Sequence, residues 1–181
     1  STNNRKFAIN LSTSYSNEQN NTITTDITSD LLLAPNLPPL YDSSGNLNWQ
    51  ENGYNFINPL AYLKQTYTAN ISTLLGNLQL NYHLLDGLVL RSSFGFNKVE
   101  ASETSIRPIS SQNPSNSPYG SSSFANNVFR GWIIEPQAEY NRLLGKGRLN
   151  VLIGGTWQEQ VNDNSIINGD GYNSDALLKS L

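Results

Sequence analysis

Hydrophobic and polar residues alternate from Ile71 to Lys98, on both sides of an Asp86-Gly87 pair. Because Asp-Gly supplies the positive φ that a tight hairpin requires, this stretch predicts two antiparallel strands joined by a short turn. Before the turn, the apolar set is Leu74, Leu78, Leu80, Tyr82 and Leu84, and the polar set is Asn77, Gln79, Asn81 and His83. After it, Leu88, Leu90, Phe94 and Phe96 alternate with Val89, Arg91, Ser93 and Asn97. Each strand therefore has one apolar and one polar face.

The same alternation along the chain predicts five strands, at 5–16, 70–84, 88–99, 128–141 and 148–160. Pro136 lies within the fourth, which argues against a regular position in a central ladder because proline has no N–H to donate. Long polar loops at 17–68, 99–127 and 161–181 alternate with short turns at 86–87 and 142–148. The predicted fold class is all-β, an antiparallel up-and-down meander with its short turns at one end and its long loops at the other.

Two environments fit such strands. In a soluble sheet the apolar face packs on a core and the polar face meets water. In an outer-membrane barrel the apolar face meets lipid and the polar face meets a wet lumen. Strands of about 10–12 residues exceed the ~5–6 usual in globular proteins and are close to the ~9–11 that cross a bilayer. Barrels also place short turns in the periplasm and long loops outside the cell, so we expect a segment of a large transmembrane β-barrel.

Composition narrows the function classes. The chain has 181 residues, a net charge of −3 and a pI of about 5.0, so it has no basic field to attract nucleic acid. It has no cysteine and hence no disulfide or thiolate site. No apolar run is as long as the ~18–20 residues of a membrane helix, and no signal peptide precedes the first strand. The absence of methionine, even at position 1, favours a segment of a longer protein.

Candidate catalytic and metal-binding groups are weakly supported. His83 is the only histidine, and no nucleophile is placed beside it. Glu135 and Glu139 share a strand face at a spacing of roughly 13 Å, which exceeds the ~5–9.5 Å of glycosidase carboxylate pairs. A set of oxygen donors near the C-terminus suggests calcium but lacks the spacing of a calcium loop, and comprises Asp163, Asn164, Asn168, Asp170, Asn173 and Asp175. We therefore expect no enzyme activity, no metal and no cofactor.

Aromatic residues among the Asn and Ser of the loops are the candidate ligand-binding set: Tyr41, Trp49, Tyr54, Phe56, Tyr62, Tyr119 and Phe124. Aromatic rings cover the apolar faces of a sugar or peptide while amides hydrogen-bond to it. The alternative is that these rings hold the loops together. A second aromatic set lies on apolar strand faces and is typical of an interfacial girdle: Tyr82, Trp132, Tyr140 and Trp157.

Several motifs occur in a distinctive order: LLLAPNLPPLYDSSGNLNW, NPLAYL, LLGNLQLNYHLLDGLVLRSSFG, W..EPQAEY and LNVLIGGTWQE. Together they resemble the SusC/RagA-type TonB-linked (TonB-dependent) outer-membrane proteins, which are large β-barrel nutrient importers. The resemblance covers nearly the whole chain and implies an internal barrel fragment in the cell outer membrane.

The same resemblance implies a transporter of glycan or peptide oligomers with a SusD-like surface lipoprotein as partner. The TonB system would act through a plug domain that has no counterpart in residues 1–181. The alternative function is a soluble extracellular carbohydrate-binding β-domain that uses the same loop aromatics.

Overall fold

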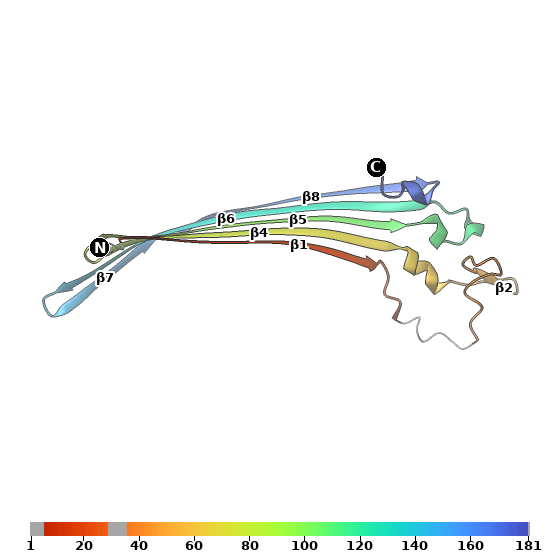
Figure 1. Ribbon diagram of the computed structural model, residues 1–181, viewed down its shortest axis with the longest axis horizontal. Coiled ribbons are helices and arrows are strands. Elements are labelled where there is room, and N and C mark those ends of the chain that lie inside the picture. The colour runs from red at the N-terminus through yellow and green to blue at the C-terminus, as the bar shows by residue number, and fades with distance from the viewer. Residues whose placement is uncertain (1–5, 29–35, 181) are drawn as a thin grey trace, which may run out of the picture. The chain divides into compact units, whose positions relative to one another are not determined.

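A computed structural model describes residues 6–28 and 36–180 (Figure 1). Six strands form one sheet: β1 (Phe7–Ile23), β4 (Thr66–Leu85), β5 (Leu88–Arg107), β6 (Gly120–Leu144), β7 (Gly147–Gly154) and β8 (Trp157–Tyr172). A separate two-stranded hairpin contains β2 (Gln50–Glu51) and β3 (Tyr54–Asn55). Short 3-10 helices occupy the connections: η2 (Pro59–Lys64), η3 (Ile109–Ser111), η4 (Pro114–Asn116) and η5 (Asp175–Leu177).

The sheet follows the order of the chain. Its strand order is β1-β4-β5-β6-β7, and β8 also pairs with β6. In Figure 1, β1, β4, β5, β6 and β8 accordingly run side by side. Between β4 and β5 the turn is two residues long, and Gly87 has a φ of 84° there. This arrangement confirms the predicted antiparallel up-and-down meander.

The stretch predicted as one strand at 148–160 is divided into β7 and β8. Gln137 of β6 pairs with Gly154 at the end of β7, and the Gly155 amide donates to the Pro136 carbonyl at 3.1 Å. In an antiparallel ladder the N–H and C=O of one residue point to the same neighbouring strand. The missing N–H of Pro136 therefore faces the β7–β8 side, and the ladder is interrupted at that position.

The remaining strands are longer than the alternation predicted, and β8 also extends beyond the predicted end at residue 160. β1 continues to Ile23, β5 to Arg107 and β8 to Tyr172, while β6 already begins at Gly120. The residues added to them were predicted as parts of the loops 17–68, 99–127 and 161–181. Their backbone groups pair with neighbouring strands, and this pairing satisfies the hydrogen-bonding groups whatever the side chains are.

The chain divides into two compact units, which we describe separately. The first contains residues 1–17, 71–100 and 127–164, and the second contains 18–70, 101–126 and 165–181. Within the described part of the first unit, Gly131 alone is buried, so this unit is a single layer of strands. A Cβ at position 131 would lie 2.5 Å from the Asn97 Oδ1, so no side chain fits there without movement.

The buried side chains belong to the second unit. Its apolar members are Leu47, Pro59, Ala61, Ala69, Pro108 and Leu178, and its polar members are Asn58, Ser111 and Ser122. The whole chain exposes 13006 Å², whereas a folded monomer of 20.0 kDa is expected to expose roughly 8,700 Å². This small core leaves many large apolar side chains exposed. None of the helices in residues 6–28 and 36–180 has the length and apolar character needed to cross a membrane.

Candidate functional site

The second unit contains a groove of about 400 Å³, here called the loop groove. Aromatic and aliphatic side chains form part of its wall, and amides, a hydroxyl and one guanidinium form the rest. The lining residues are Trp49, Asn55, Phe56, Ile57, Ala61, Tyr62, Gln65, Arg107, Ser111, Gln112, Asn113, Asn116 and Pro118. This combination fits a ligand that has both apolar faces and hydrogen-bonding groups.

A tight hairpin places the first two aromatic walls. Asn52 and Gly53 have φ values of 49° and 85°, the two positive angles that a type I′ turn requires. Beyond the two pairs of the β2–β3 ladder, the Phe56 amide donates to the Trp49 carbonyl at 3.1 Å. The hairpin therefore brings Trp49 and Phe56 to directly opposed positions at its base. The Asn-Gly dipeptide is the sequence signal for this hairpin, which the alternation analysis did not use.

Asn58 fixes the segment that follows the hairpin. Its side chain is fully buried, and its Nδ2 donates to the carbonyls of Leu40 at 2.6 Å and Asn48 at 2.9 Å. Its Oδ1 accepts the Leu60 amide at 3.0 Å and so caps η2. One buried amide therefore joins the 40–48 segment to the helix that carries Tyr62 into the loop groove.

The opposite wall is built from the connection between β5 and β6. The Gln112 Nε2 donates to the carbonyls of Pro108 at 3.2 Å and Tyr119 at 2.8 Å, which closes this connection on itself. The Gln65 Nε2 donates to the Ser111 Oγ at 3.3 Å and links this wall to the end of η2. These bonds use the amide N–H groups and leave the Gln112 Oε1 available to a ligand.

Asp175 stabilises the same wall from outside the groove. Its carboxylate accepts the backbone amides of Ile109 at 2.6 Å and Ser110 at 3.2 Å. Burial acts to raise the pKa of Asp175, but the hydrogen bonds from Ser110 and Ile109 and the charge of Lys64 outweigh it, so the pKa lies below its ordinary value. Lys64 in turn donates to the Ser110 carbonyl at 3.2 Å.

The structure brings together three of the seven loop aromatics predicted to bind ligand, namely Trp49, Phe56 and Tyr62. Three others lie outside the loop groove and are exposed: Tyr41, Tyr54 and Tyr119. Phe124 lies in β6 and not in a loop, because that strand begins earlier than predicted. Arg107 was not predicted to be a site residue, because the prediction for the loop at 99–127 considered only its aromatic residues.

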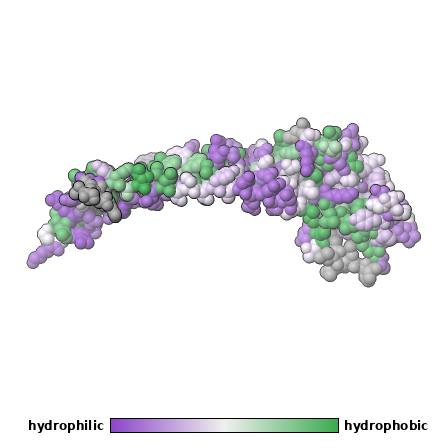
Figure 2. All heavy atoms as spheres, viewed as in Figure 1, coloured by the Kyte–Doolittle hydropathy of each residue, from purple (hydrophilic) through white to green (hydrophobic). Residues whose placement is uncertain are grey.

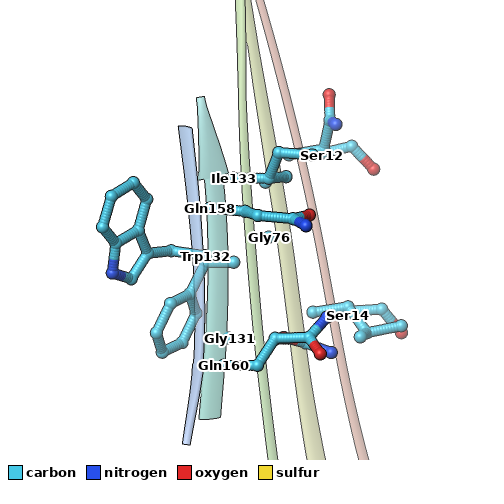
Figure 3. A pocket seen from close by; sticks show the side chains of 13 residues that line it. Ser12, Ser14, Gly76, Gly131, Trp132, Ile133, Gln158 and Gln160 are labelled. Carbon is cyan, nitrogen blue, oxygen red and sulfur yellow. The ribbon is translucent and has the colours of Figure 1, made fainter. Parts of the chain in front are cut away.

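The sheet of the first unit has a polar face, defined by side chains such as Asn77, Gln79, Arg91, Ser93 and Gln158. A groove of about 400 Å³ runs along it, and Figure 3 shows Ile133, Gln158 and Gln160 on one side of the strands and the Trp132 ring on the other. Its polar lining consists of hydroxyls and amides: Ser12, Ser14, Asn77, Asn97, Gln158 and Gln160. No ionisable side chain lines this groove in the part of the chain that the structure describes.

The carboxylates of the polar face are engaged in pairs. The Ser93 Oγ donates to Glu135 at 3.0 Å, and the Arg91 guanidinium contacts Glu139 at 2.9 Å. His83 is exposed, and its backbone amide donates to the Lys6 carbonyl at 2.8 Å. In the part of the chain that the structure describes, no nucleophile is hydrogen-bonded to the His83 imidazole.

The C-terminal oxygen donors do not form a loop as expected. Residues 157–172 are strand β8, and Asp163 within it pairs with Arg130 at 2.8 Å. Asp175 is bound to backbone amides, as described above. Among residues 6–28 and 36–180, no group of three His, Cys, Asp or Glu side chains is placed to hold a metal ion.

The other side of the sheet is its apolar face, defined by Phe7, Leu80, Tyr82, Leu90 and Trp157. Phe7 and Tyr82 meet edge to face, with ring centroids 6.2 Å apart and planes at 75°. Many large apolar side chains of this unit are exposed, and Figure 2 shows hydrophobic residues at the surface of the strands. Leu80 and Gln79 are neighbours on β4, so their side chains point to opposite faces of the sheet.

Comparison with known proteins gives structural matches only. No family model and no curated protein matches the chain. It superimposes on a chain of the RagAB peptide importer in the "closed-closed" state with a TM-score of 0.70 at 19% identity, covering 98% of this chain and 21% of that one. For the "open-open" state of the RagAB peptide importer, the TM-score is 0.67 at 19% identity, and the match covers 93% of this chain and 20% of that one. A structure of the RagAB peptide transporter gives a TM-score of 0.68 at 19% identity, and the match covers 94% of this chain and 21% of that one.

The chain thus spans about a fifth of the length of the chains it matches. At this identity the matches show a shared fold. They confirm, at the level of fold, the resemblance to the SusC/RagA-type proteins.

Proposed function

We propose that this chain is a segment of the barrel wall of a TonB-dependent outer-membrane transporter of the SusC/RagA type. The observation that carries the proposal is the first unit's single layer of strands, which is apolar on one face and lined by amides and hydroxyls on the other. In a barrel, lipid covers the first face and the aqueous lumen wets the second. Among the described residues, the sheet also ends at β1 and at β7–β8, and further strands of a larger barrel would pair with these edges.

The height of the apolar face supports this environment. On β4 the apolar positions run from Leu74 to Leu84, a length of roughly 33 Å at ~3.3 Å per residue. At a strand tilt of about 40° this corresponds to a vertical height of roughly 25 Å, which is the height of the apolar band of outer-membrane barrels. The Trp132 Nε1–H donates a hydrogen bond to the Glu159 carboxylate at 2.9 Å. A polar partner of this kind is typical of an indole at the edge of such an apolar band.

A soluble carbohydrate-binding β-domain is the second candidate, and the loop groove favours it as much as it favours a transporter. A soluble β-domain, however, buries the apolar face of its sheet beneath a second layer. Phe7, Leu11 and Trp157 are 54%, 71% and 60% exposed, and no second layer covers them in the described residues of the first unit. We therefore favour the transporter.

In the proposed transporter, the polar face forms part of the passage, and the loop groove contributes to ligand capture outside the cell. The cargo would be a glycan or peptide oligomer, and a SusD-like surface lipoprotein would cover the loops. The chains of solved structure that it matches belong to an importer named for peptides, which supports this function without establishing the cargo.

The test is selective labelling of cysteines in the full-length protein inserted in its membrane. We expect cysteines at 80 and 94 to react with a lipid-partitioned thiol reagent and those at 79 and 93 to react with a small water-soluble one. Each pair of neighbours lies on one strand at nearly the same depth, so each variant is a matched control for the other. If cysteines at 80 and 94 fail to react with the lipid-borne reagent, the apolar face is covered by protein and the proposal is wrong.

A further inference from the structure

We propose that the loop groove selects ligands that carry a free carboxylate on an apolar or aromatic body, with Arg107 as the group that binds the carboxylate. This inference rests on the proposed capture role of the loops. It specifies the ligand chemistry that one part of those loops would recognise.

Charge distribution around the loop groove is the first argument. Among the described residues, Arg107 is the only charged residue that lines it, and Arg107 is exposed. Within residues 6–28 and 36–180, the ion pairs of the chain join Arg91 to Glu139, Lys98 to Glu100 and Arg130 to Asp163, so Arg107 has no carboxylate partner there. A guanidinium beside apolar walls and without a counter-ion favours an incoming anion.

The carboxylate that stabilises this wall, Asp175, is already engaged. Asp175 accepts the amides of Ile109 and Ser110, and the cation that lowers its pKa is Lys64. Lys64 is itself held against the Ser110 carbonyl. The charge of Asp175 is therefore balanced by the nearby charge of Lys64, and the positive charge of Arg107 is left to the loop groove.

The remaining lining determines which anion fits. Trp49, Phe56 and Tyr62 offer apolar surface, which a bare inorganic anion would not use. A phosphate carries about −1.5 to −2 charges at neutral pH, more than one guanidinium balances. A carboxylate carries one charge and matches the planar guanidinium with two parallel hydrogen bonds. A carboxylate attached to an apolar or aromatic group therefore uses both parts of the loop groove.

A pair of probes that differ only in charge tests this inference: N-acetylphenylalanine and its amide. Binding is measured by calorimetry on the full-length protein in detergent. We expect the acid to bind about tenfold more tightly than the amide, since a hydrogen bond to a charged group is worth about that factor. Arg107→Gln should remove the preference, and Arg107→Lys should restore only part of it because lysine lacks the planar fork.

Two further variants separate the charge from the apolar wall. Trp49→Ala should weaken the acid and the amide by the same factor. Arg148→Gln removes an exposed arginine near the start of β7 and should change neither affinity.

Equal affinity for acid and amide, or a preference that survives Arg107→Gln, would overturn the inference. So would a failure of both probes to bind. In these cases the lipid labelling of cysteines at 80 and 94 still decides the proposed function, because those positions lie on the sheet of the first unit and not in the loop groove. Loss of that labelling would refute the transporter whichever probe binds.

Discussion

Charge placed on the apolar face should be tolerated according to depth. Leu80 lies near the middle of the apolar positions of β4, which run from Leu74 to Leu84. An arginine at the midplane of a bilayer costs roughly 2–4 kcal/mol, and the cost falls to about 0–1 kcal/mol near the interface. We therefore expect Leu80→Arg to destabilise the full-length barrel by about 3 kcal/mol and Leu84→Arg by less than about 1 kcal/mol.

Gln79→Arg is the matched control, because residue 79 neighbours Leu80 but lies on the polar face. Its arginine would project into water and should change the free energy of unfolding by no more than about 0.5 kcal/mol. The assay is reversible denaturant unfolding of the full-length protein from lipid vesicles, followed by tryptophan fluorescence. The midpoints should fall in the order Leu84→Arg above Leu80→Arg, with Gln79→Arg equal to the unmodified protein.

A soluble domain makes a different prediction for the same series. With a protein core in place of lipid, the cost would follow the burial of each residue and not its distance from the ends of the apolar band. Equal destabilisation by Leu80→Arg and Leu84→Arg would therefore refute the depth argument. A strong effect of Gln79→Arg would refute the assignment of the two faces.

Three further outcomes follow from single residues. Asn58→Ala removes three hydrogen bonds of a fully buried side chain, so hydrogen exchange of the Leu60 amide should accelerate by a factor that corresponds to about 3 kcal/mol. Asn55→Ala is the control and should leave this exchange rate unchanged. The pKa of Asp175 is lowered in the folded state, so its contribution to stability is present above the ordinary aspartate pKa and is lost as the pH falls through the lowered pKa. Protease cleavage near Ile109 should therefore increase over that acidic range, and Asp175→Asn should abolish this pH dependence. Gly87→Val should impair folding, because Gly87 has a φ of 84° and its added Cβ would collide with the Asn141 carbonyl; an unchanged midpoint would show that this hairpin end adapts freely.

Alternation predicted the strands correctly where the two faces of the sheet differ. Leu78, Leu80 and Leu90 alternate with Asn77, Gln79 and Arg91, because side chains of a strand point to opposite faces with a period of two. Where both faces are polar, this signal disappears. The extension of β1 to Ile23 and of β8 to Tyr172 consists mainly of Asn, Asp, Ser, Thr and Gln, a composition that is typical of loops. Pairing with long neighbouring strands determines these extensions, and no local pattern reports it.

The loop groove was predictable only in part. Aromatic residues among amides drew attention to Trp49, Phe56 and Tyr62, and these three do converge. The other residues that line the groove are brought there by contacts between distant parts of the chain, such as the hydrogen bond between Gln65 and Ser111, which lie 46 residues apart. Arg107 reaches the groove because β5 continues to that residue. A local sequence pattern predicts neither the long-range contact nor the length of β5.

In the transporter that we propose, the two grooves would serve different steps, with ligand capture at one and passage at the other. The polar face of the first unit offers neutral hydroxyls and amides, and its charges are paired as Arg91 with Glu139. Such groups exchange hydrogen bonds with water and with a polar solute at nearly equal free energy, so they bind a solute weakly and do not retain it. The loop groove combines apolar walls with Arg107, whose guanidinium has no carboxylate partner in the described residues. Both features favour binding of a ligand over binding of water. A transporter needs this contrast, because a wall that bound its cargo as tightly as the capture site would hold it in the passage.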